Sequence, residues 1–194
     1  MADSTTPVER PEGARREATP AEFKAMAHPL RMRIIRLCLH EQLTNKELAE
    51  RLDVDPATVL HHVRTLCATG FLEADPPRTG KRGALEKPYR STGKSWILSV
   101  SDPHDLVTSV VANIDALRGE VLDAGPNAVV TSARLGLCLT PADAHELADR
   151  IDELVQTYAA KPPAPDGQLY GLFATLHRLT TTSPPTTNTV RTNA

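Results

Sequence analysis

The chain has 194 residues, of which 40 % are hydrophobic and only 4 % aromatic. This length allows one or two domains with an aliphatic core, and no apolar run approaches the roughly 18 residues that predict a membrane span. The net charge of −2 is unevenly spread: residues 21–100 carry 13 Lys and Arg against 9 Asp and Glu, whereas residues 101–194 carry 6 against 11. The first part therefore suits a polyanionic partner and the second does not.

Both ends of the chain are polar and lack apolar periodicity, so we expect residues 1–19 and residues 180–194 to be disordered tails. The N-terminal tail has no apolar stretch of the kind that a secretory signal contains. Three widely spaced cysteines, Cys38, Cys67 and Cys138, occur without a CxxC motif. They favour a reducing cytoplasm over a disulfide framework, and we expect small core residues, with only Cys67 a candidate reactive thiol.

Two helical segments follow the N-terminal tail. Residues 20–42 are predicted to form a helix that breaks at His28, because a residue that precedes a proline avoids the helical region. Residues 43–54 are predicted to form a short helix. Thr44 is a natural N-cap for it, and Glu47, three residues later, completes a capping box.

Residues 53–70 are predicted to form a second short helix. Asp55 is a good N-cap, Pro56 suits the first helical position and Gly70 suits the position just beyond the end. Apolar spacing predicts that the buried side of this helix consists of Val59, His62, Val63 and Leu66.

A hairpin with a basic tip is predicted next. It comprises a short strand at 71–74, a charged loop at 75–88 and a return strand at 89–92. Two helices joined by a short turn and followed by such a hairpin make a winged helix-turn-helix. We therefore predict an α+β fold that begins with a winged helix-turn-helix domain over residues 20–98.

A helix of this kind fits the DNA major groove, where its outward side chains reach base edges. Arg64 can pair with a guanine edge or a phosphate, His61 can donate a hydrogen bond, and Leu60 offers methyl groups to thymine. Basic residues of the hairpin and the amide groups that open the preceding helix would hold phosphates. The predicted DNA-binding residues are Thr44, Asn45, Lys46, Pro56, Ala57, Thr58, Leu60, His61, Arg64, Arg78, Lys81, Arg82, Lys87 and Arg90.

The adjacent pair His61–His62 does not predict a shared chemical site. Consecutive residues on a helix point about 100° apart, and no ligand residue lies four positions away on either side. No nucleophile and orienting acid are spaced for catalysis. We expect His62 to be a half-buried structural residue and His61 to contact DNA or solvent.

Residues 99–125 are predicted to form a linker and one long amphipathic helix. Its apolar face has no evident partner in the chain, which makes it a candidate for dimerisation, although it could instead belong to an intramolecular core. The residues of this face, which we call the apolar stripe, are Leu106, Val107, Val110, Val111, Ile114, Leu117 and Val121.

Residues 126–179 are predicted to form a strand–helix–strand unit. Leu135, Leu137 and Leu139 alternate as in a strand, and residues 169–176 are apolar on both sides, as in a buried strand. Thr140 is a natural N-cap for the helix between them. A unit of this size is too small to stand alone, so we expect it to serve dimerisation or to hold an effector.

The stretches "AMAHPLRMRIIRLC" and "LTNKELAERLDVDPATVLHHVRTLCATGFLE" resemble the ArsR-type winged-helix repressors of bacteria, over roughly residues 20–98. Within them, "TVLHHVRTL" is similar to the recognition helix of that family, with Leu60 where the family usually has a serine. "EKPYRSTGKSW" is similar to the passage that follows the wing in a subgroup. The resemblance implies a homodimeric repressor that binds a palindromic operator, with the long helix at 105–123 pairing beside the first helix.

Metal sensing is the best-known activity of that family, but its ligand patterns are incomplete in this sequence. No cysteine stands at the start of the helix before the recognition helix. Asp102 and His104 match the first half of a second pattern, whose other half is missing. We therefore expect neither a metal nor another cofactor.

The sequence thus favours a dimeric, sequence-specific transcriptional regulator of the cytoplasm, associated with the nucleoid when it is bound to double-stranded DNA, with no membrane contact and an unknown small-molecule effector as a possible ligand. One alternative is a protein-interaction module whose winged helix docks a partner protein; the acidic second part of the chain and the apolar stripe favour it. An enzyme is not expected, since no phosphate loop, catalytic triad or carboxylate pair is present.

Overall fold

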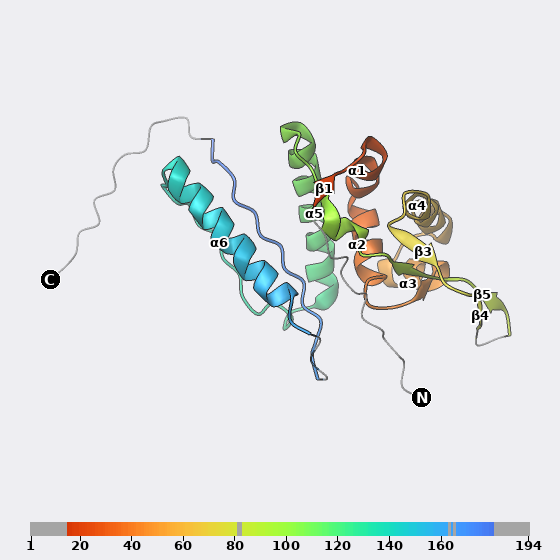
Figure 1. Cartoon of the computed structure of the whole chain (residues 1–194). Helices are drawn as coiled ribbons and strands as arrows, with labels where there is room; N and C mark the ends of the chain where they lie inside the picture. The colour runs from red at the N-terminus through yellow and green to blue at the C-terminus, as the bar shows by residue number, and fades with distance from the viewer. Residues whose placement is uncertain (1–14, 81–82, 163, 165, 181–194) are drawn as a thin grey trace. The chain divides into compact units, whose positions relative to one another are not determined.

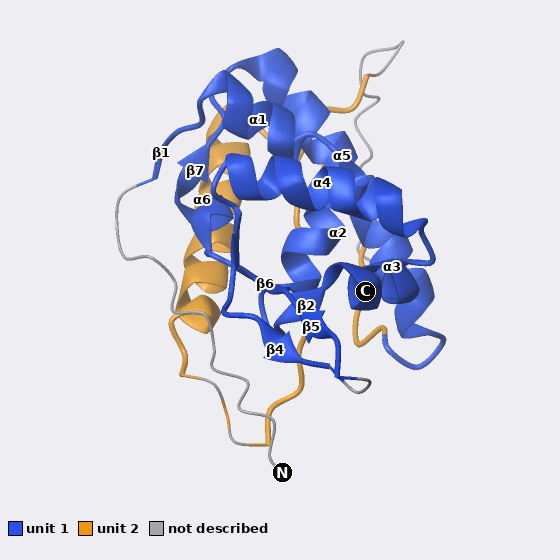
Figure 2. Cartoon of the chain, turned by 90° about the vertical axis from the view of Figure 1, so that its right-hand side faces the viewer, with its two compact units in different colours: residues 1–128 blue, residues 129–194 orange. Residues whose placement is uncertain are grey.

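The chain divides into two compact units, residues 1–128 and residues 129–194, each of which is described by itself (Figure 1; Figure 2). The structure, a computed structural model, describes residues 15–80, 83–162, 164 and 166–180.

The first two helices are α1 (Pro20–Met26) and α2 (Pro29–Leu37), and the predicted break at His28 is confirmed. The backbone of His28 is extended, and its Nδ1 accepts a hydrogen bond from the backbone N–H of Leu30 at 3.2 Å. The ring nitrogen thereby satisfies an amide that has no partner within α2, so His28 is the N-cap of this helix.

The two central helices are α3 (Asn45–Leu52) and α4 (Pro56–Ala68), and the caps predicted for both are confirmed. Thr44 and Glu47 form a capping box at the start of α3, in which each side chain accepts a hydrogen bond from the backbone of the other. Two orphan amides are satisfied in this way, which fixes where α3 begins.

The turn between α3 and α4 is short and sharply bent. Asp53 has a φ of 51°, in the left-handed region that short polar side chains tolerate, and it ends α3. Two residues later, Asp55 Oδ1 accepts hydrogen bonds from the backbone N–H groups of Ala57 and Thr58, at 2.8 and 3.2 Å. This cap sets the direction in which α4 leaves the turn.

An antiparallel sheet closes the other side of unit 1. Its strand order is β2 (Leu43–Thr44), β6 (Pro88–Ser91) and β3 (Leu72–Ala74), with Leu43 opposite Tyr89 and Leu72 opposite Ser91. The strands predicted on either side of the charged loop are therefore confirmed, whereas β2 was not predicted. Within the loop, β4 (Arg78–Thr79) pairs with β5 (Leu85–Glu86) and extends the hairpin; we call residues 75–88 the wing.

The prediction that the whole of residues 1–19 is disordered is wrong for the described residues 15–19. There β1 (Arg16–Glu17) pairs in parallel with β7 (Leu98–Ser99), which follows the short 3-10 helix η1 (Lys94–Ile97). The physical reason is Glu22, a buried carboxylate that pairs with Arg16 and with Lys94, each at 2.6 Å. The predicted tail at 180–194 lies outside the described residues except for Thr180.

The core of unit 1 lies between the first four helices and the three-stranded sheet. Its fully buried side chains include Phe71, Ile34, Leu48 and Leu66. Cys38 is buried as expected, and burial raises the pKa of its thiol to about 12. Cys67 is half-buried, and burial raises its thiol pKa too, which argues against a reactive thiol. Cys138 is exposed, so the prediction that it is a core residue is wrong.

The long helix predicted after the linker is α5 (Pro103–Ala124), which packs mainly on α2 and also contacts α1. Its buried residues, Ala112 and Ala116, are small and allow a close approach. Arg33 and Arg36 of α2 form ion pairs with Asp123 and Glu120 of α5, the second at 3.9 Å. The face that packs within the chain is therefore not the predicted apolar stripe.

The apolar stripe itself is largely open to solvent in the single chain. Val110 and Leu117 are half-buried at its edge, and the other five residues are exposed: Leu106, Val107, Val111, Ile114 and Val121. No helix within the described ranges combines the length and the apolar character that crossing a membrane requires.

Unit 2 contains one helix, α6 (Pro141–Ala159), among its described residues. Thr140 and Asp143 form a capping box at its start, so the predicted helix and its N-cap are confirmed. The two predicted strands that flank it are not formed: residues 129–139 and 168–179 are irregular and take part in no described strand pairing. The physical reason is that a strand needs a neighbouring strand to take up its backbone hydrogen bonds, and neither segment has one within the described residues.

Candidate nucleic-acid interface

Helix α4 presents one buried side and one exposed side, as its sequence predicted. The predicted inner residues Val59, His62, Val63 and Leu66 are all buried. On the opposite side, Ala57, Thr58, His61 and Arg64 are exposed and Leu60 is half-buried. In Figure 2, α4 lies on the side of unit 1 that is turned toward the viewer, with α3 next to it and the wing strands below. The outer side of α4 is therefore exposed, and an exposed helix of this kind fits the major groove of DNA.

The start of α4 is already saturated by the chain's own groups. Asp55 occupies the first free amide groups of the helix, and Pro56 has no N–H to offer. Asn45 of α3 donates from Nδ2 to the carbonyl oxygen of Pro56 at 2.9 Å, while its Oδ1 is buried without a hydrogen-bond partner. Asn45 thus ties the two helix starts together, a structural role that the sequence did not predict.

Thr44 is a correction among the predicted DNA-binding residues. Its side chain is 6 % exposed, and its hydroxyl oxygen accepts a hydrogen bond from the backbone N–H of Glu47. The carboxylate of Glu47 in turn occupies the backbone N–H of Thr44 at 2.7 Å. The side chain of Thr44 is therefore engaged within the chain, and Thr44 is a buried structural cap rather than a residue exposed to DNA.

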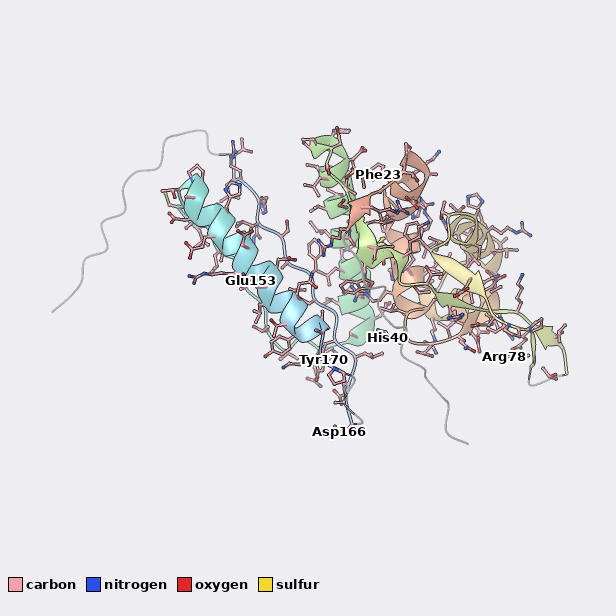
Figure 3. All side chains as sticks on the ribbon, viewed as in Figure 1. Phe23, His40, Arg78, Glu153, Asp166 and Tyr170 are labelled. Atoms are coloured by element: carbon pink, nitrogen blue, oxygen red, sulfur yellow. The ribbon has the colours of Figure 1, made fainter. Side chains whose placement is uncertain are left out.

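Two of the predicted basic residues are held by acidic neighbours. Arg78, labelled in Figure 3, pairs with Glu47 of α3 at 3.0 Å and with Glu86 of the wing at 3.9 Å. Arg90 pairs with Glu73 at 3.0 Å and with Asp75 at 2.8 Å. The pairs with Glu47, Glu86 and Glu73 are partly exposed and each contributes little to stability, whereas the side chain of Asp75 is largely buried. A phosphate must compete with all four carboxylates.

The remaining predicted cations are less engaged. Arg64 makes no hydrogen bond or ion pair with another residue in the described part of the chain, and Lys87 lies 6.0 Å above the ring of Tyr89. Lys46 has only an exposed pair with Glu50 at 3.8 Å. The predicted Lys81 and Arg82 lie outside the described residues. Of the predicted cations that the structure describes, Arg64 and Lys87 are thus the two that form no ion pair.

His62 is packed into a cluster of basic side chains behind α4. Its ring centroid lies 4.5 Å from that of His28 and 5.5 Å from that of His61. Nη1 of Arg31 lies 3.4 Å from Nδ1 of His62. Since an arginine can only donate, Nδ1 accepts and the neutral ring carries its proton on Nε2.

Arg31 was missed by the sequence-based predictions, although it connects three elements. Its Nε donates to the carbonyl oxygen of Ala25 and its Nη2 to that of Lys24, both at 2.6 Å, while Nη1 reaches His62. The residue therefore ties the end of α1 to the inner side of α4. A distance of 31 residues separates Arg31 from His62, so no local pattern could have indicated the contact.

Acid should destabilise this arrangement through His62. Burial, followed by the charges of His28, Arg31 and His61, lowers the pKa of His62 to about 4, and burial also lowers that of His28. In the unfolded chain His62 binds a proton near pH 6.5, whereas in the folded chain it stays neutral until about pH 4. The contribution of the neutral ring to the free energy of unfolding is therefore fully present above pH 6.5 and is lost as the pH falls toward 4. We expect a loss on the order of 1–2 kcal/mol in the free energy of unfolding between about pH 7 and pH 5.

Urea denaturation at a series of pH values measures this loss. The H62Q variant should show a clearly smaller drop in unfolding free energy over the same interval, whereas the control H61Q should retain the drop because His61 is exposed. An equal drop in the wild type and in H62Q would show that His62 does not cause it.

The structure also explains why the half-motif Asp102–His104 need not indicate a metal site. Asp102 is the N-cap of α5, and its Oδ1 accepts hydrogen bonds from the backbone N–H groups of His104 and Asp105, at 2.9 and 3.0 Å. Among the described residues, no three His, Cys, Asp or Glu side chains are grouped so that they could hold a metal ion.

Comparison with known proteins agrees with this geometry. A family described as "Helix-turn-helix domain" matches residues 26–74, from the end of α1 to β3, which is about a quarter of the chain. The chain thus contains a helix-turn-helix domain, and the match supports a DNA-binding transcription regulator.

Two further comparisons add little. A solved structure of the transcriptional regulator SlyA is 13 % identical, with 66 % of this chain and 72 % of that chain covered, but its TM-score is 0.28 and the likeness carries no argument. No curated protein matches the chain.

Proposed function

We propose that the protein is a homodimeric, sequence-specific transcriptional regulator of the ArsR type that represses genes by binding a palindromic operator. Helix α4 would lie in the major groove and the wing would follow the DNA backbone. The observation that carries the proposal is the outer side of α4, where Arg64 is exposed and unpaired within the described chain while the helix itself is rigidly held from behind. A preorganised helix with a free guanidinium suits the reading of a guanine edge.

The proposed dimer is supported by the apolar stripe of α5. Packing on α2 uses Ala112 and Ala116, so the larger residues of the stripe remain available. A contiguous exposed row of aliphatic side chains on a regulator marks an interaction surface. A twofold axis beside α5 would relate two copies of α4, and an operator with two inverted half-sites would match that symmetry.

Fluorescence anisotropy with the full-length protein tests the proposal. The protein should bind labelled duplexes selected from random sequences at least about a thousandfold more tightly than unselected DNA of equal length. Both affinities are measured at the same moderate salt concentration, because binding to phosphates depends on salt. Equal affinity for selected and unselected duplexes would contradict sequence-specific recognition. Such a result would favour the alternative in which the helix-turn-helix domain docks a partner protein.

A further inference from the structure

Unit 2 leaves an unusual amount of apolar surface uncovered. None of its described residues is buried, and twelve of its large apolar side chains are exposed; Val130, Leu135 and Leu172 are 77 %, 73 % and 67 % exposed. A fully exposed side chain of this kind has an apolar area of roughly 60–120 Å². The exposed parts of these twelve side chains therefore add up to about 500–800 Å² of apolar surface. Summed over the unit, that area approaches the roughly 800 Å² that each partner contributes to a stable interface.

Most of this surface belongs to two irregular segments, residues 129–139 and residues 168–179, that flank α6 in the sequence. Neither contains a proline, and within the described chain neither forms a backbone hydrogen bond or a strand pairing. The two segments do approach each other, since Leu179 Cδ1 lies 3.8 Å from the point where a Cβ on Gly136 would stand. An apolar segment whose backbone N–H and C=O groups have no hydrogen-bond partner is a template for the addition of another strand.

We propose that residues 129–139 and residues 168–179 become strands of an intermolecular β-sheet with a second copy of this chain. Helix α6 would cover one face of that sheet, because two of its apolar residues, Leu147 and Ile151, are already half-buried in the single chain. The inference extends the homodimer of the proposed function, but it does not depend on DNA recognition.

Three features favour a second copy over another occupant. The summed exposed area approaches what each partner of a stable dimer provides, as estimated above. A twofold axis perpendicular to a strand makes it antiparallel to its own copy, and the identical segment has the same length and the same alternation of apolar side chains. Arg134 is the one charged residue of 129–139, so self-pairing opposes like charges only if Arg134 lies on the axis itself.

Hydrogen–deuterium exchange of the full-length protein tests the inference, with the mass measured in parallel by sedimentation. At a protein concentration that gives the dimer mass, amides of both segments should exchange at least a hundredfold more slowly than unstructured peptides. Dilution to the monomer should remove that protection, while peptides from α4 keep theirs. Exchange at the unstructured rate in the dimer would overturn the inference, and so would protection that persists in the monomer, because the strands would then pair within one chain.

A matched pair of variants provides a second measurement. L137D places a charge on the apolar side of the segment and should shift the dimer dissociation constant upward by at least tenfold, whereas S132D in the same segment should shift it less than threefold. Unchanged exchange in α4 shows that unit 1 remains folded in both variants. Equal dissociation constants for the two variants would overturn the inference, and loss of DNA binding alone, with the protection intact, would count against the proposed function only.

Discussion

The R64A variant is expected to lose about 1–3 kcal/mol of specific DNA-binding free energy, which is roughly a 5- to 150-fold rise in the dissociation constant for a selected duplex. The reason is the position of Arg64, which is exposed on the outer side of α4 and makes no ion pair within the described chain. Its guanidinium is free to bind without first breaking an internal contact. Fluorescence anisotropy on selected and on random duplexes measures the change.

Two further variants separate base reading from charge. R64K keeps the charge but loses the bidentate fork, so it should resemble R64A if Arg64 reads a base and resemble the wild type if Arg64 contacts a phosphate. R150A removes the same charge from α6, where Arg150 is exposed and pairs with Glu146, and should change affinity little. An equal weakening by R64A and R150A would show that only net charge matters.

The F71A variant is expected to lower the free energy of unfolding by about 3–5 kcal/mol. Phe71 is 1 % exposed and is the largest fully buried side chain of unit 1. Its backbone N–H donates to the carbonyl oxygen of Leu66 at 2.9 Å, and Lys94 Nζ lies 5.4 Å from its ring centroid. Removal of the ring leaves a cavity in the core of unit 1, and the loss is a large fraction of the stability of a typical domain.

Urea denaturation followed by circular dichroism measures this loss. L85A removes a comparable amount of apolar side chain from the wing, where Leu85 is 75 % exposed, and should change the free energy of unfolding by less than about 0.5 kcal/mol. If F71A unfolded at the same urea concentration as the wild type, the core would be centred elsewhere.

Local chemistry made much of the fold predictable from the sequence. The caps Thr44, Asp55 and Thr140 place the starts of their helices because each satisfies amides within three residues. The inner side of α4 followed from the spacing of aliphatic residues, and it placed His62 among them. Such signals act within a turn or two of helix, where the sequence directly states which groups are near one another.

Contacts between distant residues were not predictable in the same way. The reach of Arg31 to His62 and of Arg78 to Glu47 depends on how whole elements pack, and nothing in the local sequence indicates it. Thr44 was predicted to bind DNA because it opens a helix whose N-terminal amides attract a phosphate, but its side chain is buried and caps α3 through Glu47. The alternation around Leu137 indicated a strand, although a strand also needs a partner that its own sequence does not specify.

The double engagement of Glu47 has a consequence for the discrimination between DNA and other polyanions. Its carboxylate accepts hydrogen bonds from the backbone N–H of Thr44 and from the guanidinium of Arg78, so Arg78 already has an anionic partner within the chain. Any backbone phosphate that binds Arg78 has to displace this built-in substitute, so part of the attraction is cancelled before binding begins. In the proposed complex, Arg78 would therefore add less to loose, sliding contacts than to binding of a duplex whose bases also contact α4.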